Sequence, residues 1–179
     1  FDYKVYWKNR GVKIRQRLLE REKIFFDWIK PKTKVLDVAV GNSGLLLSLK
    51  KDKACDVHAF DISQEAIDAQ NNSGVIAERK NISFDDFNIT DTYDALILSE
   101  ILEHLPFPEI LMKKIADKAK FFLVSVPNSA FYKFRLQLLF GRFLKQWAFH
   151  PSEHLRFWSH RDFLDWVDSM DFDVVKYEA

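Results

Sequence analysis

The stretch VLDVAVGNSG, residues 35–44, decides the fold of this chain. An almost continuous apolar run leads into small residues and two glycines, Gly41 and Gly44. An apolar strand that is buried on both faces and followed by a glycine-bearing turn is typical of the start of a nucleotide-binding βα unit. The pattern predicts a strand over residues 34–40, and residues 45–51 suit the helix that follows the turn.

Strand and helix patterns alternate along the rest of the sequence. Further strands are predicted over residues 57–61, 75–77, 93–98, 121–126 and 173–177. Helices are predicted over residues 14–29, 64–70, 108–118, 131–143 and 160–170. Ser63 is a plausible N-cap for the helix from residue 64, and Ser159 with Asp162 three residues later resembles a capping box that opens the helix from residue 160. Such alternation is typical of right-handed parallel crossovers. The sequence therefore predicts an α/β, Rossmann-like, doubly wound and mostly parallel sheet with helices on both faces.

Length and composition indicate one globular domain. We expect residues 1–179 to form it, with an N-terminal helical or lid segment over 1–30 and a substrate-side insertion over 129–160. No apolar stretch approaches the roughly 20 residues of a membrane span, and the first residues do not form a signal peptide. The only cysteine, Cys55, excludes an internal disulfide. A cytoplasmic location without a membrane partner is the simplest interpretation.

Two classes of nucleotide cofactor fit the loop. Ala39, Gly41 and Gly44 occupy the three positions of a GxGxxG pattern. Asp61 lies 20 residues after Gly41 (61 − 41), where a dinucleotide site places its ribose carboxylate. On these features alone an NAD(P)-dependent oxidoreductase is an alternative, and so is a tight turn that binds no ligand.

A resemblance separates these alternatives. VLDVAVGNSG lies without gaps over the V-L-D-x-G-x-G-x-G loop of class I S-adenosylmethionine-dependent methyltransferases. HAFDIS at 58–63 and YDALILSEILEHL at 93–105 resemble the second- and fourth-strand signatures of the same superfamily. A nicotinamide dehydrogenase has no reason to carry the last of these. The resemblance implies S-adenosylmethionine as cofactor and S-adenosylhomocysteine (SAH) as product.

The C-terminal part resembles a narrower group, the MetW-like methyltransferases of methionine biosynthesis. The similarity lies in SVPNSAFYKFRLQLLFGRF at 125–143 and HLRFWSHRDF at 154–163. It implies methyl transfer by direct displacement to a small polar or anionic metabolite or a sugar- or phosphate-type acceptor. It also leaves open a partner subunit that assists a biosynthetic acyltransferase with little chemistry of its own. Because the last strand of the methyltransferase fold is missing, we expect the chain to continue past Ala179.

The resemblance assigns donor-binding roles to individual residues. Asp61 would accept both ribose hydroxyl hydrogens through charge-assisted bonds, with Ile62 beside the adenine. Asp37 would steady the loop or meet the donor's ammonium through water. We expect Gly44, rather than Ser43, to take the strained backbone conformation. The residues expected to wrap the methionine part are Ala39, Gly41, Asn42 and Gly44.

Further donor contacts are expected from the ends of later strands. Asn81 is the best match for the residue that accepts a hydrogen bond from the adenine amine, with Ile82 beside the ring. Asp85 and Asp86 are the alternatives for that role. The residues expected to line the methionine side, after the fourth strand, are Ser99 and Glu100.

The acceptor side is assigned from residue chemistry. His104 and His154 are the candidate catalytic bases, although each could be an ordinary hydrogen-bonding histidine. Arginines bind anionic groups as bidentate forks. The candidates for substrate binding are Arg135, Arg156 and Arg161 and, from an N-terminal lid or an amphipathic helix at the sheet edge, Tyr6, Trp7 and Arg10.

Two other functions are not predicted. The five histidines are scattered along the sequence and no HExxH or paired CxxC motif occurs, so no metal site is expected. The net charge is only +1 and no aromatic-basic motif marks a strand face, which argues against nucleic acid as a partner.

Overall fold

The computed structural model describes residues 12–83, 87–146, 150 and 153–179. These residues fall into two compact units. The sheet unit consists of the described residues in 12–99 and 114–125, and the helical unit consists of the described residues in 100–113 and 126–179. No helix in the described part of the chain combines the length and apolar character needed to cross a membrane.

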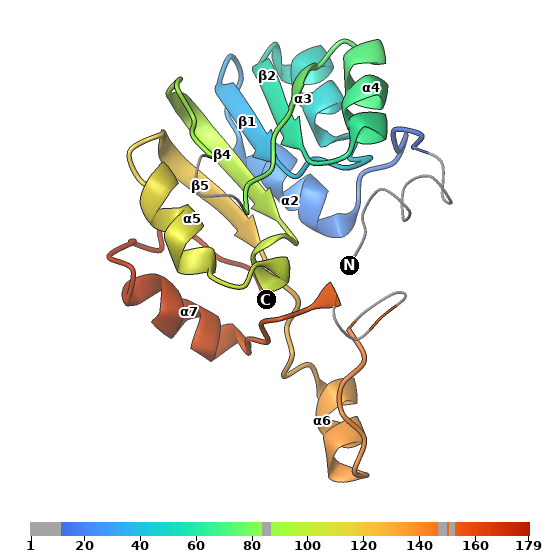
Figure 1. The fold of residues 1–179 in the computed structure, drawn as a ribbon, viewed down its shortest axis with the longest axis vertical. Coiled ribbons are helices and arrows are strands. Elements are labelled where there is room, and N and C mark those ends of the chain that lie inside the picture. The colour runs from blue at the N-terminus through green and yellow to red at the C-terminus, as the bar shows by residue number, and fades with distance from the viewer. Residues whose placement is uncertain (1–11, 84–86, 147–149, 151–152) are drawn as a thin grey trace. The chain divides into compact units, whose positions relative to one another are not determined.

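Five parallel strands form the centre of the sheet unit, in the order β3-β2-β1-β4-β5 (Figure 1). The strands are β1 (Lys34–Val38), β2 (Asp56–Asp61), β3 (Ile76–Arg79), β4 (Tyr93–Ser99) and β5 (Ala119–Ser125). Consecutive residues of β1 are buried, as expected for a strand covered on both faces. The strand order reverses between β1 and β4, which is where ligands bind in open α/β sheets. The predicted Rossmann-like α/β fold is confirmed.

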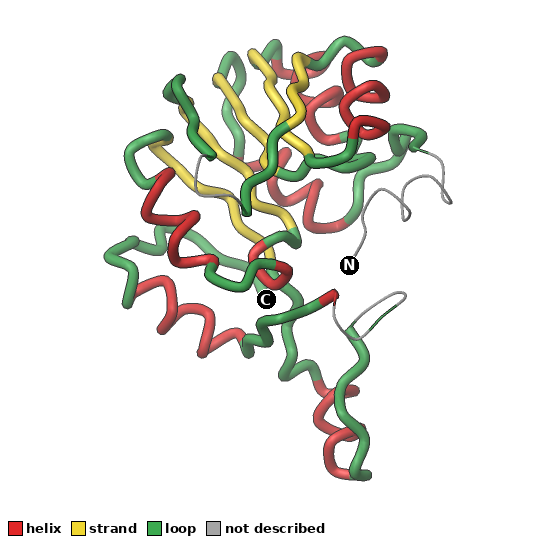
Figure 2. Tube along the Cα trace, viewed as in Figure 1, coloured by secondary structure: helices red, strands yellow, loops and turns green. Residues whose placement is uncertain are grey.

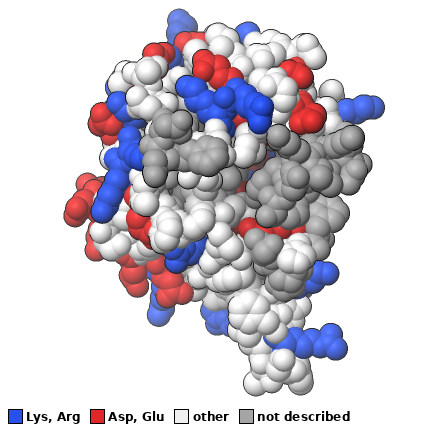
Figure 3. Space-filling view, viewed as in Figure 1, with Lys and Arg blue, Asp and Glu red and all other residues white. Residues whose placement is uncertain are grey.

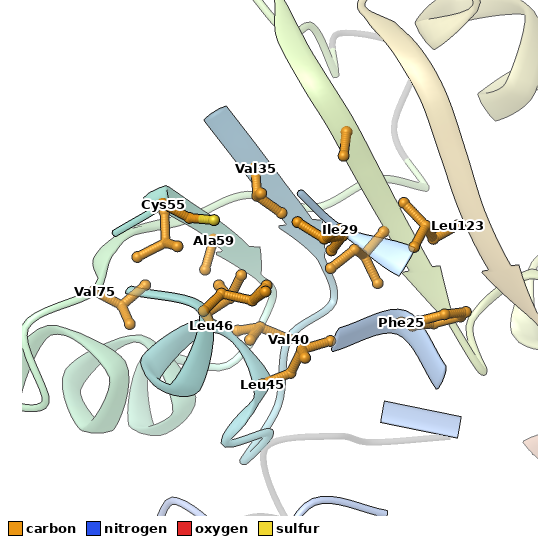
Figure 4. Packing of buried hydrophobic residues seen from close by; sticks show 14 of the residues in the cluster. Phe25, Ile29, Val35, Val40, Leu45, Leu46, Cys55, Ala59, Val75 and Leu123 are labelled. Carbon is orange, nitrogen blue, oxygen red and sulfur yellow. The ribbon is translucent and has the colours of Figure 1, made fainter. Parts of the chain in front are cut away.

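Three helices belong to the sheet unit: α2 (Glu20–Trp28), α3 (Leu45–Lys53) and α4 (Gln64–Asn72). Helix α3 packs on α2 and β2, and α4 packs on β2 and β3. Apolar side chains from α2, α3 and the strands form one buried cluster (Figure 4) that includes Phe25, Leu46, Val35 and Leu123. Burial of one such side chain contributes roughly 1.5–3 kcal/mol, so this cluster fixes α3 against the sheet.

The predicted helix over residues 14–29 is wrong in its first part, because α2 begins only at Glu20. The carboxylate of Glu22 accepts the backbone N–H of Leu19 at 2.7 Å and caps the helix there. The preceding segment is irregular and binds the glycine loop instead, where the backbone N–H of Arg15 donates to the carbonyl of Asn42 at 3.0 Å. The spacing of apolar residues in the sequence gives no information about either contact.

The predicted strand over residues 173–177 is also wrong. Residues 172–179 form no strand or helix (Figure 2). Val174 and Val175 are 46% and 80% exposed, so the apolar residues that suggested a strand are not buried against a sheet. Apolar composition over five residues was therefore insufficient evidence for a strand.

The helical unit contains η1 (Leu102–His104), α6 (Tyr132–Leu139), α7 (His160–Asp168) and most of α5 (Pro108–Ile115). The predicted capping box is confirmed, because Ser159 Oγ and the carboxylate of Asp162 each accept the other's backbone N–H at 3.1 Å. Helix α6 is shorter than predicted and none of its residues is buried. Its visible surface, at the bottom of Figure 3, combines white side chains, which carry no Lys, Arg, Asp or Glu charge, with blue Lys and Arg side chains.

Candidate functional site

The turn between β1 and α3 lies at the switch point of the sheet. The backbone N–H groups of Ala39 and Val40 both donate to the carbonyl of Phe60, at 2.8 and 3.2 Å, which ties the turn to the end of β2. Ala39 and Gly41 have φ values of +68° and +52°. This left-handed conformation is readily adopted by glycine and strained for alanine. The turn therefore has the backbone of a glycine-rich loop although its sequence has lost one glycine.

Gly44 does not take the strained conformation that we expected of it, since its φ is −91°. Glycine is needed there for space. A Cβ atom at Gly44 would lie closer than 3.0 Å to the carbonyl oxygen of Arg15. The Ser43 hydroxyl, in turn, donates to Glu22 at 2.7 Å and accepts the N–H of Leu45 at 3.2 Å. Ser43 is thus a buried link between the loop and α2 rather than a defective glycine.

The two positive-φ positions predict opposite responses to substitution. Ala39→Gly relieves a strain of about 1–2 kcal/mol and gives back about 0.4–1 kcal/mol through the more flexible unfolded chain, so we expect a net stabilisation of about 0.5–1 kcal/mol. Gly41→Ala introduces that strain and is expected to destabilise by about 1 kcal/mol. Urea unfolding monitored by tryptophan fluorescence measures both, and equal signs for the two variants would contradict the assignment.

Asp61, at the end of β2, holds the turn in place. Its Oδ2 accepts the N–H of Gly41 and its Oδ1 the N–H of Ser63, both at 2.8 Å. Burial raises the pKa of Asp61, and backbone N–H groups, including that of Ile62, oppose the rise. A carboxylate offers about four acceptor sites, so these two bonds leave capacity for ribose hydroxyls. The predicted role of Asp61 toward a donor stays a proposal.

A second carboxylate, Glu22 of α2, joins the loop to the segment before the helix. Glu22 is 3% exposed and accepts from the guanidinium of Arg15, the hydroxyl of Ser43 and the N–H of Leu19. Arg15 also donates to the side-chain oxygen of Asn42 at 3.1 Å. Asn42 was predicted to bind the methyl donor, and in the structure its side-chain oxygen accepts a hydrogen bond from Arg15.

Asp37, the penultimate residue of β1, is the third carboxylate and is 2% exposed. Burial raises its pKa well above the ordinary value of 3.8, the charges of Glu22 and Asp61 raise it further, and Arg15 opposes them. Among the described residues no group hydrogen-bonds its buried Oδ1. Three buried carboxyl groups with one guanidinium make this end of the sheet favourable to a cationic ligand.

Helix α4 supports the loop from its other side. Gln70 is fully buried, and its Nε2 donates to the carbonyls of Ser43 and Gly41 at 3.0 and 3.3 Å. These bonds fix the orientation of two peptide carbonyls in the turn. Because the peptide unit is planar, they also fix the direction of the N–H groups in the same peptide units. Gln70 was not predicted, because a glutamine within a helical pattern gives no sign of burial.

The residues expected around the adenine are placed less tightly. Asn81 and Ile82 are half-buried in the turn after β3, and the side-chain oxygen of Asn81 accepts the N–H of Ser83 at 3.0 Å. The carbonyl of Ile62 accepts from Arg79 at 3.0 Å. Their adenine contacts remain predictions. The two alternatives for the adenine amine, Asp85 and Asp86, lie outside the described residues.

Ser99 ends β4 and belongs to a polar group that the sequence did not reveal. Its hydroxyl accepts from Arg21 Nε at 3.2 Å and lies 3.1 Å from the hydroxyl of Ser125, at the end of β5. Glu100 is the first residue of the helical unit and has a φ of +53°. A non-glycine residue in this conformation costs about 1–3 kcal/mol and is common at functional sites.

The two candidate bases meet within the helical unit. The rings of His104 and His154 lie edge to face with centroids 4.7 Å apart, and His104 Nδ1 contacts the carbonyl of Glu153. Burial lowers the pKa of His104 below 6.5 and that of His154 to about 4. Both imidazoles are therefore neutral near pH 7.

Two of the three predicted arginines in the described part of the chain bind backbone groups of their own unit. Arg135 donates to the carbonyl of Ala130 at 2.6 Å, and Arg156 donates to the carbonyl of Pro106. Arg161 is exposed in the first turn of α7. Their role toward an anionic acceptor remains a prediction. The lid residues Tyr6, Trp7 and Arg10 lie outside the described part of the chain.

A parallel sheet with a left-handed turn after its first strand and a carboxylate ending its second defines a nucleotide-binding α/β class of protein. Residues 6–177 match the family model described as a methyltransferase domain, and the chain belongs to this methyltransferase family. This confirms the superfamily inferred from VLDVAVGNSG. The MetW-like likeness stays a prediction. No curated protein matches the sequence.

Solved structures share the fold. Magnesium protoporphyrin IX methyltransferase from Synechocystis PCC 6803, with bound SAH, has a TM-score of 0.68 at 14% identity over 97% of this chain and 90% of its own. A putative methyltransferase from Haloferax volcanii, in complex with the Trm112 activator, has a TM-score of 0.64 at 15% identity over 94% and 71%. The [4+2]-cyclase SpnF has a TM-score of 0.64 at 13% identity over 91% and 62%. Such identities show the fold alone.

Several similar proteins are longer than this chain. It spans 32% of a coclaurine N-methyltransferase and 47% of the plantazolicin methyltransferase BpumL.

Proposed function

We propose that the chain binds S-adenosylmethionine and transfers its methyl group to a small polar or anionic acceptor. The observation that carries this proposal is a set of three buried carboxyl side chains in the sheet unit, those of Glu22, Asp37 and Asp61. They lie around a turn whose backbone has the conformation of a glycine-rich loop. S-adenosylmethionine is a cation at neutral pH, because its sulfonium and ammonium outnumber its one carboxylate. NAD(P) is an anion, which such a site disfavours.

The residues present fit this donor. Asp37 offers a buried carboxylate oxygen that lacks a hydrogen-bond partner among the described residues, and an ammonium would satisfy it. Asp61 would bind the ribose diol, and the turn from Ala39 to Gly44 would wrap the methionine part. When bound, the donor supplies an activated methyl group for direct displacement, so alignment of the acceptor carries most of the catalysis.

His104 is the better candidate for a base that removes a proton from the acceptor. A backbone carbonyl only accepts, so the contact with Glu153 requires the proton of neutral His104 to be on Nδ1. Its Nε2 then carries a lone pair that can accept a proton. His154, with a pKa of about 4, is a weaker base.

Titration calorimetry with SAH, S-adenosylmethionine and NADP tests the proposal. We expect one molecule of SAH or S-adenosylmethionine to bind and NADP not to bind. Asp61→Ala should weaken SAH binding by about 1.5–3 kcal/mol, the value of a hydrogen bond to a charged group. Asp68→Ala, an exposed change on α4, is the matched control and should leave affinity unchanged.

Binding of NADP, or an unchanged affinity of Asp61→Ala for SAH, would contradict the proposal. If folded protein binds none of the three ligands, the second candidate gains weight, namely a partner-binding subunit. One observation favours that candidate. Large apolar side chains on and beside α6 are exposed, including Leu139, Phe140 and Phe143 at 77%, 78% and 62%. Exposed apolar groups of this size commonly mark protein interfaces.

A further inference from the structure

Three potential metal ligands converge within the helical unit. Glu103 and His104 lie in η1, and His154 lies 50 positions later in the sequence (154 − 104). One ligand atom from each, a carboxylate oxygen and two ring nitrogens, all lie within 4.8 Å of one another. The two segments are held together by the backbone, because the N–H groups of Leu155 and Arg156 donate to the carbonyl of Glu103 at 2.7 and 3.1 Å.

The hydrogen bond between His104 and the Glu153 carbonyl sets the tautomer of the ring. Nδ1 donates to the carbonyl of Glu153, so the lone pair of the neutral ring is on Nε2. Nε2 lies 3.8 Å from Oε1 of Glu103. Metal-binding histidines almost always donate their other ring N–H to a carbonyl or carboxylate, which fixes the tautomer and the ring orientation. The Glu153 carbonyl serves that purpose here.

His154 supplies an independent observation. His154 is only 9% exposed, and its Nδ1 is buried without a hydrogen-bond partner among the described residues. Buried ring nitrogens are normally satisfied by protein, water or an ion. The ring stands edge to face against that of His104, so the two imidazoles share one small volume.

We propose that Glu103, His104 and His154 form a binding site for a divalent transition metal ion of the zinc type. Two imidazoles and one carboxylate are ligands typical of zinc and its first-row neighbours, whereas magnesium and calcium prefer oxygen alone. Zinc ligands at 2.0–2.1 Å in a tetrahedron are about 3.3 Å apart, so the side chains close by roughly 1.5 Å on binding. Three protein ligands leave a position for water or for an oxygen of another ligand. A bound ion takes the Nε2 lone pair of His104, so this histidine can act as a base only while the metal site is empty.

The test uses the tag-free chain after dialysis against a chelator. Zinc titration by competition with a chromophoric chelator is expected to give one site per chain, and Mg²⁺ is expected not to compete. His104→Ala and His154→Ala should each weaken zinc binding by about 100-fold or more, and Glu103→Gln by about 10-fold or more. His160→Ala is the matched control, because this histidine lies in the same unit and packs against Tyr177 instead.

The absence of a stoichiometric zinc site, or equal zinc affinity of His154→Ala and His160→Ala, would overturn the assignment. Because a ligand variant could fail to fold, X-ray absorption at the zinc edge of the unaltered protein gives a second measurement. Two imidazole nitrogens per zinc support the site, whereas a sulfur ligand from Cys55 or oxygen ligands alone overturn it. SAH binding on the same samples is independent, so failure of the methyltransferase proposal leaves the metal result readable.

Discussion

Glu22→Ala is expected to destabilise the protein by about 3 kcal/mol. Removing one member of a buried ion pair typically costs about 3–5 kcal/mol, and the side chain of Arg15 is 32% exposed, which places the effect at the lower end. The hydroxyl of Ser43 and the N–H of Leu19 lose their acceptor in the same variant. Because Ser43 belongs to the glycine loop, SAH affinity should fall together with stability. Urea unfolding and titration calorimetry measure the two effects.

The helix provides its own control two residues away. Glu20 is exposed and forms its ion pair with Lys23 in the next turn, so Glu20→Ala should change stability little. Glu22→Gln keeps the shape and one acceptor oxygen, and it should fall between alanine and the unaltered chain. If Glu22→Ala and Glu20→Ala unfold at the same urea concentration, Glu22 does not hold the loop.

Signals that depend on neighbouring residues were predicted well. Ser63 and Ser159 cap α4 and α7 as expected, with side-chain oxygens accepting N–H groups three residues later. The strands from β1 to β5 were each found within a few residues, because apolar runs between turn signals identify buried parallel strands. Residues 173–177 are the exception. A short apolar run forms a strand only where a neighbouring strand is available to pair with it, and these residues pair with no strand in the described part of the chain.

The site was only partly predictable, because the missing information is long-range. Glu22 lies in a helical pattern whose charged residues are usually exposed. Its burial depends on contacts with residues outside that pattern, among them Ser43, 21 residues later. His104 and His154 were identified as candidate bases one at a time, and no sequence pattern predicted that their rings would meet. The positive φ of Ala39 was likewise hidden, since alanine seldom adopts it.

Asp37→Asn is expected to raise stability and lower donor affinity at the same time. A folded-state pKa above the unfolded value of about 3.9 means that the folded protein binds the proton more tightly, so this group makes stability fall as pH rises above about 4. Removing the charge should therefore stabilise the protein at neutral pH. Loss of the carboxylate should weaken SAH binding by about 1.5–3 kcal/mol.

The same carboxyl group predicts a proton released on binding. An ammonium beside Asp37 favours its ionised form, so SAH should bind more tightly as pH rises toward the pKa of the group. Calorimetry in buffers of different ionisation enthalpy counts the proton. Asp37→Asn should abolish the release, whereas Asp68→Asn on the exposed side of α4 should retain it. If Asp37→Asn is more stable but binds SAH with unchanged affinity and proton release, the prediction is contradicted. The Asp37 carboxylate would then destabilise the fold without contacting the donor, and other residues would bind the donor's ammonium.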